Sequence, residues 1–155
     1  MFLGLRGPLA DSFAIVVEAK FDADLKLAEA LALHFLDLGG LGVRDLAAYR
    51  DDILILAGPV SGLRSPFRIY RWHPLDKGRE VQDAELLYPK PDAVHDNKVV
   101  RADMARADAD EHPEGICLLE RGGRDGLLVL HDNPRRNRIA GSRYTADWIP
   151  LTVTG

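Results

Sequence analysis

Three short apolar runs recur along the chain, and each is closed by a proline. They read MFLGLRGP at residues 1–8, DILILAGP at 52–59 and GLLVLHDNP at 126–134. Short apolar runs that end in Gly, Asn or Pro are typical of strands buried on both faces. An α-helix does not fit, because each run is too short and proline ends it. The pattern predicts the same strand and turn three times.

The segments after these runs also match one another. FAIVVEAKFD at 13–22 matches FRIYRWHPLD at 67–76, and RYTADWIPL at 143–151 is a weaker third copy. The third copy places Trp148 at the position of Trp72, so we expect both rings to be substantially buried. This register across two strands and a loop predicts a repeated unit.

Each unit is expected to have a strand on either side of this pair. LGVRDLAAY precedes the second copy and HPEGICLLE the third, and aligning Leu46 with Ile116 places Arg44 opposite Glu114. On the other side, KLAEALALHF at 26–35 corresponds to REVQDAELLY at 79–88. The Ala, Leu and Glu content of 26–35 favours a helix, whereas its apolar residues at odd positions fit a strand. The position in the repeat favours the strand.

The chain is therefore predicted to be all-β, a partial β-propeller of about three four-stranded antiparallel blades with the first and last incomplete. We expect one domain, 1–155, with blade-like repeats at 1–38, 39–88 and 112–155 and an insertion at 89–111. The predicted strands lie near 1–6, 13–21, 26–35, 44–49, 52–57, 66–73, 80–88, 115–120, 126–131 and 143–150.

The chain contains the segments GLRGP, GLGVRDLA and PEGI and ends near YTADWIPL. In these segments it resembles a bacterial domain-of-unknown-function family that is β-propeller-like. Members of that family are about twice as long, so the chain resembles the C-terminal half of one. The resemblance implies no established activity. A more remote similarity, to phytase-like and gluconolactonase-like propellers, implies carboxylates on inner strands that hold a divalent cation.

The composition of the chain argues against several classes of function. The net charge of −4 and the scattered Lys and Arg argue against a nucleic-acid partner. No apolar run approaches the roughly 18 residues of a membrane span, and no signal peptide is evident. Cys117 is the single cysteine, which excludes an internal disulfide and fits a reducing compartment. We therefore expect a cytoplasmic protein without a membrane partner.

The candidate binding residues lie where the predicted inner strands begin or where the turns close. Arg44, Asp45 and Glu114 stand at strand starts, and Arg6 and Asp132 lie at the turns. Oxygen ligands from Asp45 and Glu114 are candidates for Ca²⁺, although this ion takes six to eight oxygens and further ligands are needed. The structural alternative is ion pairing and turn hydrogen bonding by these same residues. No cofactor is indicated with certainty, and no catalytic residue is evident.

Two functions follow from the pattern. The first is a propeller-type binding or scaffold module without catalysis. The second is a divalent-metal-assisted hydrolase of the phytase-like or lactonase-like kind, whose carboxylates converge in a central channel. Incomplete end blades leave unpaired strand edges and apolar faces. We therefore expect either a homodimer or a missing N-terminal half, with LTVTG at 151–155 folding back beside residues 1–8 as a third way to close the edge.

Overall fold

The computed structural model describes residues 1–60, 66–74, 81–88, 112–132, 134 and 136–151. In these residues the regular structure is β-strand, with one 3₁₀ turn, η2, at Arg136–Arg138 and no α-helix. The predicted all-β class is confirmed, and none of the described sheets is closed on itself. The chain divides into two compact units, Met1–Tyr88 and Pro89–Gly155.

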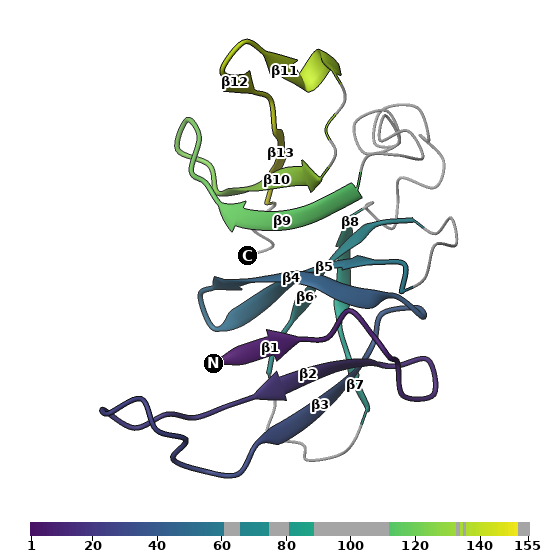
Figure 1. The fold of residues 1–155 in the computed structure, drawn as a ribbon, viewed down its shortest axis with the longest axis vertical. Helices are drawn as coiled ribbons and strands as arrows, with labels where there is room; N and C mark the ends of the chain where they lie inside the picture. The colour runs from purple at the N-terminus through teal and green to yellow at the C-terminus, as the bar shows by residue number, and fades with distance from the viewer. Residues whose placement is uncertain (61–65, 75–80, 89–111, 133, 135, 152–155) are drawn as a thin grey trace. The chain divides into compact units, whose positions relative to one another are not determined.

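The first unit contains two four-stranded sheets (Figure 1). The first sheet has the order β1-β2-β3-β7, formed by Phe2–Gly4, Ala14–Glu18, Ala32–Asp37 and Val81–Asp83. It is antiparallel except that β7 runs parallel to β3. The second sheet has the order β4-β5-β6-β8, formed by Gly42–Tyr49, Asp52–Gly58, Arg68–Trp72 and Glu85–Tyr88. It is antiparallel throughout, as expected for the predicted complete blade.

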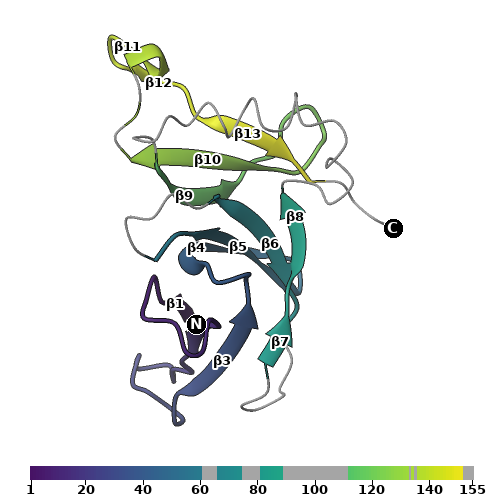
Figure 2. The same cartoon turned by 90° about the vertical axis from the view of Figure 1, so that its right-hand side faces the viewer.

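The second unit has a three-stranded antiparallel sheet in the order β13-β10-β9 (Figure 2). Its strands are His112–Leu118 (β9), Gly126–Asp132 (β10) and Asp147–Pro150 (β13). A small hairpin of Ile139–Ala140 (β11) and Arg143–Tyr144 (β12) lies between β10 and β13. The predicted single strand at 143–150 is therefore wrong in one respect, because it is divided into β12 and β13.

Two further strand predictions need correction. The strand expected at 80–88 is divided at Ala84, and β7 joins the first sheet while β8 joins the second. The division lets Gln82 enter the interior from the first sheet, where its side chain is buried.

The strand expected at 26–35 begins only at Ala32. Before it, residues 20–31 form an arm whose turn is fixed by the Asp22 carboxylate, which accepts the N–H groups of Asp24 and Lys26. The helical alternative is wrong.

Three cross-strand pairs occupy the positions that the sequence pattern aligns. Ile53 lies opposite Trp72 in the second sheet, and Leu128 lies opposite Trp148 in the sheet of the second unit. In the first sheet the aligned residues Phe2 and Glu18 also face each other. The second and third strands of each predicted repeat therefore pair in one common register.

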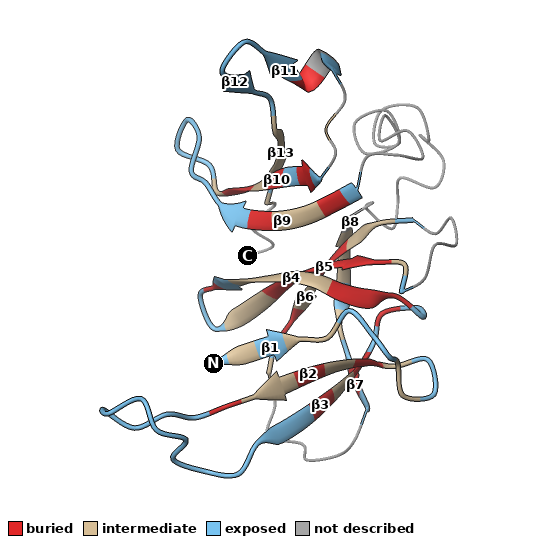
Figure 3. Ribbon diagram, in the orientation of Figure 1, coloured by how far each residue is buried: buried red, intermediate tan, exposed pale blue. Residues whose placement is uncertain are grey.

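The core of the first unit lies between its two sheets, where buried residues follow β5 and the inward side chains of β2 and β3 (Figure 3). Trp72 is completely buried, with its ring centroid 5.4 Å from that of Phe2 and 5.1 Å from that of His34. The predicted burial of Trp72 is confirmed. Trp148 is only half-buried, with its ring against Gly126, so the two tryptophans are not equivalent in packing.

A buried polar chain links the two sheets of the first unit. The Trp72 indole N–H donates to Gln82 Oε1 at 3.0 Å, and Gln82 Nε2 lies 3.1 Å from His34 Nδ1. His34 Nε2 in turn lies 2.9 Å from the Glu18 carboxylate. These contacts satisfy polar groups that would otherwise be buried without partners.

Replacing Gln82 with Leu is expected to lower the free energy of unfolding by about 1–3 kcal/mol, since the Trp72 N–H and His34 Nδ1 lose their shared partner. Urea unfolding followed by far-UV circular dichroism measures the change. Asp51→Asn, at an exposed position in the turn between β4 and β5, is the control and should leave stability nearly unchanged. An equal loss in both variants would contradict the role given to the buried amide.

Candidate functional site

A hollow of about 540 Å³ lies in the first unit, at the end of the second sheet where β5 begins and β6 ends. Five of its six lining residues have polar side chains, and the lining residues are Asp52, Arg71, His73, Asp83, Ala84 and Glu85. Small-molecule sites are concave and carry a few convergent polar groups on a mostly apolar lining, and this hollow has the concavity and the polar groups. This hollow is therefore the candidate binding site.

The charged groups of the hollow form a connected network. Asp52 Oδ1 lies 2.7 Å from His73 Nδ1, and Asp52 Oδ2 lies 3.8 Å from Arg71 Nε. Arg71 also forms an ion pair with Glu85, which faces it across β6 and β8. The three carboxylates of the lining outnumber the single guanidinium, so the hollow carries a surplus of negative charge whether or not His73 is protonated.

The change of sheet at Ala84 explains why this lining comes together. It places Asp83 at the end of a strand in the first sheet and Glu85 at the start of a strand in the second. Asp52 and His73 come from the adjacent ends of β5 and β6. The sequence analysis missed these residues because they form no contiguous motif. The available signal was the polar pair Arg71 and His73 on either side of the apolar Trp72, where β6 ends.

The predicted site residues of the first unit lie at the opposite end of its second sheet. Arg44 is the extra residue of a β-bulge between Val43 and Asp45, and its Nη2 donates to the carbonyl of Pro59 at 2.6 Å. Its guanidinium lies over the Phe67 ring, 5.5 Å from the centroid. Bulges re-aim side chains and recur beside binding sites, but this arginine is held by its own sheet.

Arg6 and Asp45 are also tied to this end. Arg6 is exposed in the turn after β1, and its carbonyl oxygen would lie 2.0 Å from a Cβ placed on Gly42, so the two backbones are in close contact. Asp45 Oδ1 accepts the N–H of Leu46 at 2.8 Å. These contacts fit the structural alternative, in which the same residues hold the local backbone instead of binding a ligand.

Glu114 and Asp132 belong to the second unit, whereas Asp45 belongs to the first. Glu114 is skipped by the β9–β10 pairing, which moves from Pro113 to Gly115, so it too stands at a bulge. Asp132 is exposed and faces His112 in the last pair of that ladder. Within the part of the chain that the structure describes, no three His, Cys, Asp or Glu residues are grouped to hold a metal ion. A Ca²⁺ site at Asp45 and Glu114, with the hydrolase it would serve, stays a prediction.

A second polar cluster is buried in the second unit. Asp147 lies 2.8 Å from His131 Nε2 and forms a bidentate pair with Arg138, at 2.9 and 3.0 Å. Burial by itself raises the pKa of the Asp147 carboxyl. The hydrogen bonds from His131 and Arg138, with the positive charge of Arg138, outweigh it and hold the pKa below its usual value. The side chain of His131 is fully buried, so this cluster ties η2 and β13 to β10 and offers no open site.

Comparisons with known proteins identify one family. A family model described as "Protein of unknown function (DUF3616)" matches residues 1–147. No curated protein and no solved structure matches the chain. In the described residues, no helix is long and apolar enough to cross a membrane. The expected cytoplasmic location stays a prediction.

Proposed function

Since the matching model spans most of its length, the chain belongs to the DUF3616 family, and we propose that it is a propeller-type module that binds a small ligand. The blade-like arrangement is supported by the shared register of three strand pairs, Phe2–Glu18, Ile53–Trp72 and Leu128–Trp148. It is supported further by the bulges at Arg44 and Glu114, which stand in the first strands of the second and third predicted repeats.

The hollow beside β5, β6 and β8 is the proposed ligand site. The observation that carries the proposal is its lining by three carboxylates around one arginine. Asp52 and Glu85 are already engaged by His73 and Arg71. Asp83 is exposed and makes no side-chain hydrogen bond or ion pair with the described residues around it. A small organic cation with hydrogen-bonding groups complements this arrangement, because a charge-assisted bond to Asp83 adds to those already formed.

Thermal unfolding with three probes tests the proposal. L-Arginine should raise the melting temperature relative to an equal concentration of sodium chloride, since a ligand that binds only the folded state stabilises it, by about 2.7 kcal/mol at 100 times Kd. Neutral glucose and anionic citrate should not. Asp83→Asn should abolish the arginine shift, whereas Asp11→Asn, an exposed carboxylate outside the hollow, should keep it. An equal shift with citrate, or an unchanged shift in Asp83→Asn, would refute the cationic ligand.

A further inference from the structure

The first sheet has two faces that differ in what covers them. On β2 and β3 the residues Ala14, Val16 and Leu36 are completely buried and point toward the second sheet. Side chains alternate along a strand, so the intervening residues point the other way. Six of these outward residues, here called the outer face, are apolar: Leu3, Ile15, Val17, Leu33, Phe35 and Val81. Asp37 and Asp83, which pair at the ends of β3 and β7, also point outward beside them.

The outer face is continuous across all four strands. Leu3, Val17 and Leu33 lie opposite one another in one row across β1, β2 and β3. Ile15, Phe35 and Val81 form a second row across β2, β3 and β7. An exposed antiparallel face is ordinarily polar, so two complete apolar rows indicate a surface that another protein surface covers.

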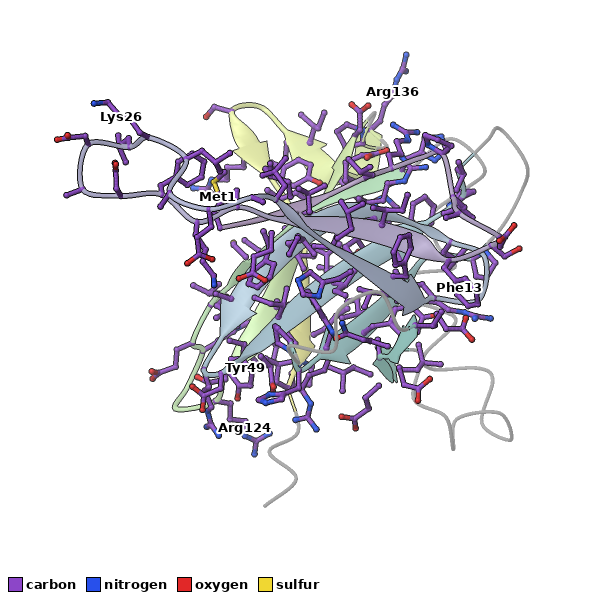
Figure 4. All side chains as sticks on the ribbon, turned by 90° about the horizontal axis from the view of Figure 1, so that it is seen from below. Met1, Phe13, Lys26, Tyr49, Arg124 and Arg136 are labelled. Atoms are coloured by element: carbon purple, nitrogen blue, oxygen red, sulfur yellow. The ribbon has the colours of Figure 1, made fainter. Side chains whose placement is uncertain are left out.

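The arm at residues 20–31 extends this surface. It projects from the sheet, with Lys26 near its far end (Figure 4). Its two sides are joined by the bonds of Asp22 N–H to the Lys26 carbonyl and of Ala28 N–H to the Lys20 carbonyl. Apolar side chains nevertheless stand in solvent along it. Phe21 and Leu27 are exposed where they pair, and Leu25 at the turn is 81% exposed with a φ of 59°. A left-handed conformation is unusual for a leucine.

The size of this apolar surface matches a protein interface. Its exposed large side chains are Met1, Leu3, Phe21, Leu25, Leu27, Leu31, Leu33 and Val81. Their exposed parts amount to several hundred Å², which is the order of the ~800 Å² that each partner buries in a standard interface. Soluble monomers rarely leave so large an apolar patch uncovered.

We propose that a second copy of the chain covers the outer face and the arm. The surface supplies both halves of a twofold contact, because a projecting apolar arm lies beside an apolar sheet face on the same unit, and each arm can cross the face of the other copy. Charge does not oppose this contact. The arm carries Lys20 and Lys26 against Asp22, Asp24 and Glu29, and four of these charges are paired within it, as Lys20–Glu29 and Lys26–Asp24. The two apolar rows themselves carry no charge, and the outward carboxylates Asp37 and Asp83 lie beyond them at the ends of β3 and β7.

Sedimentation equilibrium at micromolar concentrations tests the proposal. The wild-type chain should sediment at twice its monomer mass of 17.1 kDa. Leu33→Glu on the face and Leu25→Ser on the arm should each raise the dimer dissociation constant at least tenfold. Leu25 is so exposed that its replacement leaves the folded core intact. The matched control is Leu130→Glu, a 41% exposed leucine of β10 in the second unit, which should leave the dissociation constant unchanged.

Two results would overturn the inference. One is a wild-type chain that stays monomeric throughout the micromolar range. The other is a dimer that Leu130→Glu dissociates while Leu33→Glu and Leu25→Ser do not, which would place the contact on the second unit. Far-UV circular dichroism establishes that each variant is folded before its mass is interpreted.

Discussion

Replacing Trp72 with Ala is expected to lower the free energy of unfolding of the first unit by about 3–5 kcal/mol. The indole is completely buried in β6 and touches the rings of Phe2 and His34 from the other sheet. Its removal leaves a large cavity between the sheets. It also deprives Gln82 Oε1 of its donor. Since domains are stable by only about 5–15 kcal/mol in total, this is a large fraction of the stability.

Urea unfolding followed by far-UV circular dichroism measures the effect, and Trp148→Ala is the matched control. Trp148 has the same position in its own strand pair, but it is half-buried and its N–H donates to the exposed carbonyl of Leu119. Its replacement should cost clearly less. Equal losses in the two variants would show that ladder position, and not burial between sheets, sets the contribution of each tryptophan.

The contrast between these tryptophans shows what the sequence could predict. Strand identity and register follow from local alternation and from turn residues, so the pairing of Trp72 with Ile53 and of Trp148 with Leu128 agrees with the repeat. Burial depends on what covers the sheet. In the first unit the first sheet covers Trp72, and no periodicity within residues 67–76 carries that information.

The division of residues 80–88 between two sheets could not be predicted from the sequence pattern for a related reason. Both halves alternate as strands, and the change of sheet at Ala84 depends on the fit of Gln82 against Trp72 and His34. The candidate hollow follows from this division, since it brings Asp83 and Glu85 to the ends of β5 and β6. The odd-numbered leucines of 25–35 did predict a strand rather than a helix, but only the residues from Ala32 onward pair with β2.

The buried cluster of the second unit was also not predicted, because its members belong to three separate elements. His131 is the last residue but one of β10, Arg138 lies in η2 and Asp147 begins β13. The sequence analysis gave the neighbouring Asp132 a binding role, but the structure places Asp132 in solvent and turns His131 inward. In an alternating strand, adjacent residues face opposite sides. The inward residue of the pair is the one that forms the network.

Asp147→Asn is expected to destabilise the second unit by about 3–5 kcal/mol near neutral pH, because it leaves the buried guanidinium of Arg138 without its carboxylate. Hydrogen exchange of the β10 amides measures the loss. Glu120→Gln, an exposed carboxylate of the same unit, is the control and should change little. A loss in Asp147→Asn no larger than in Glu120→Gln would exclude the cluster as a source of stability.

The same substitution should change how stability depends on pH. The pKa of Asp147 is lower in the folded chain than in the unfolded chain, where a free aspartate titrates near pH 3.9. Its contribution is therefore fully present above about pH 4 and is lost as pH falls through the lower, folded pKa. The wild-type chain should lose stability in that acidic range more steeply than Asp147→Asn, and the two should converge there. Parallel curves down to about pH 2 would show that the ionised carboxylate of Asp147 is not what holds η2 and β13 to β10.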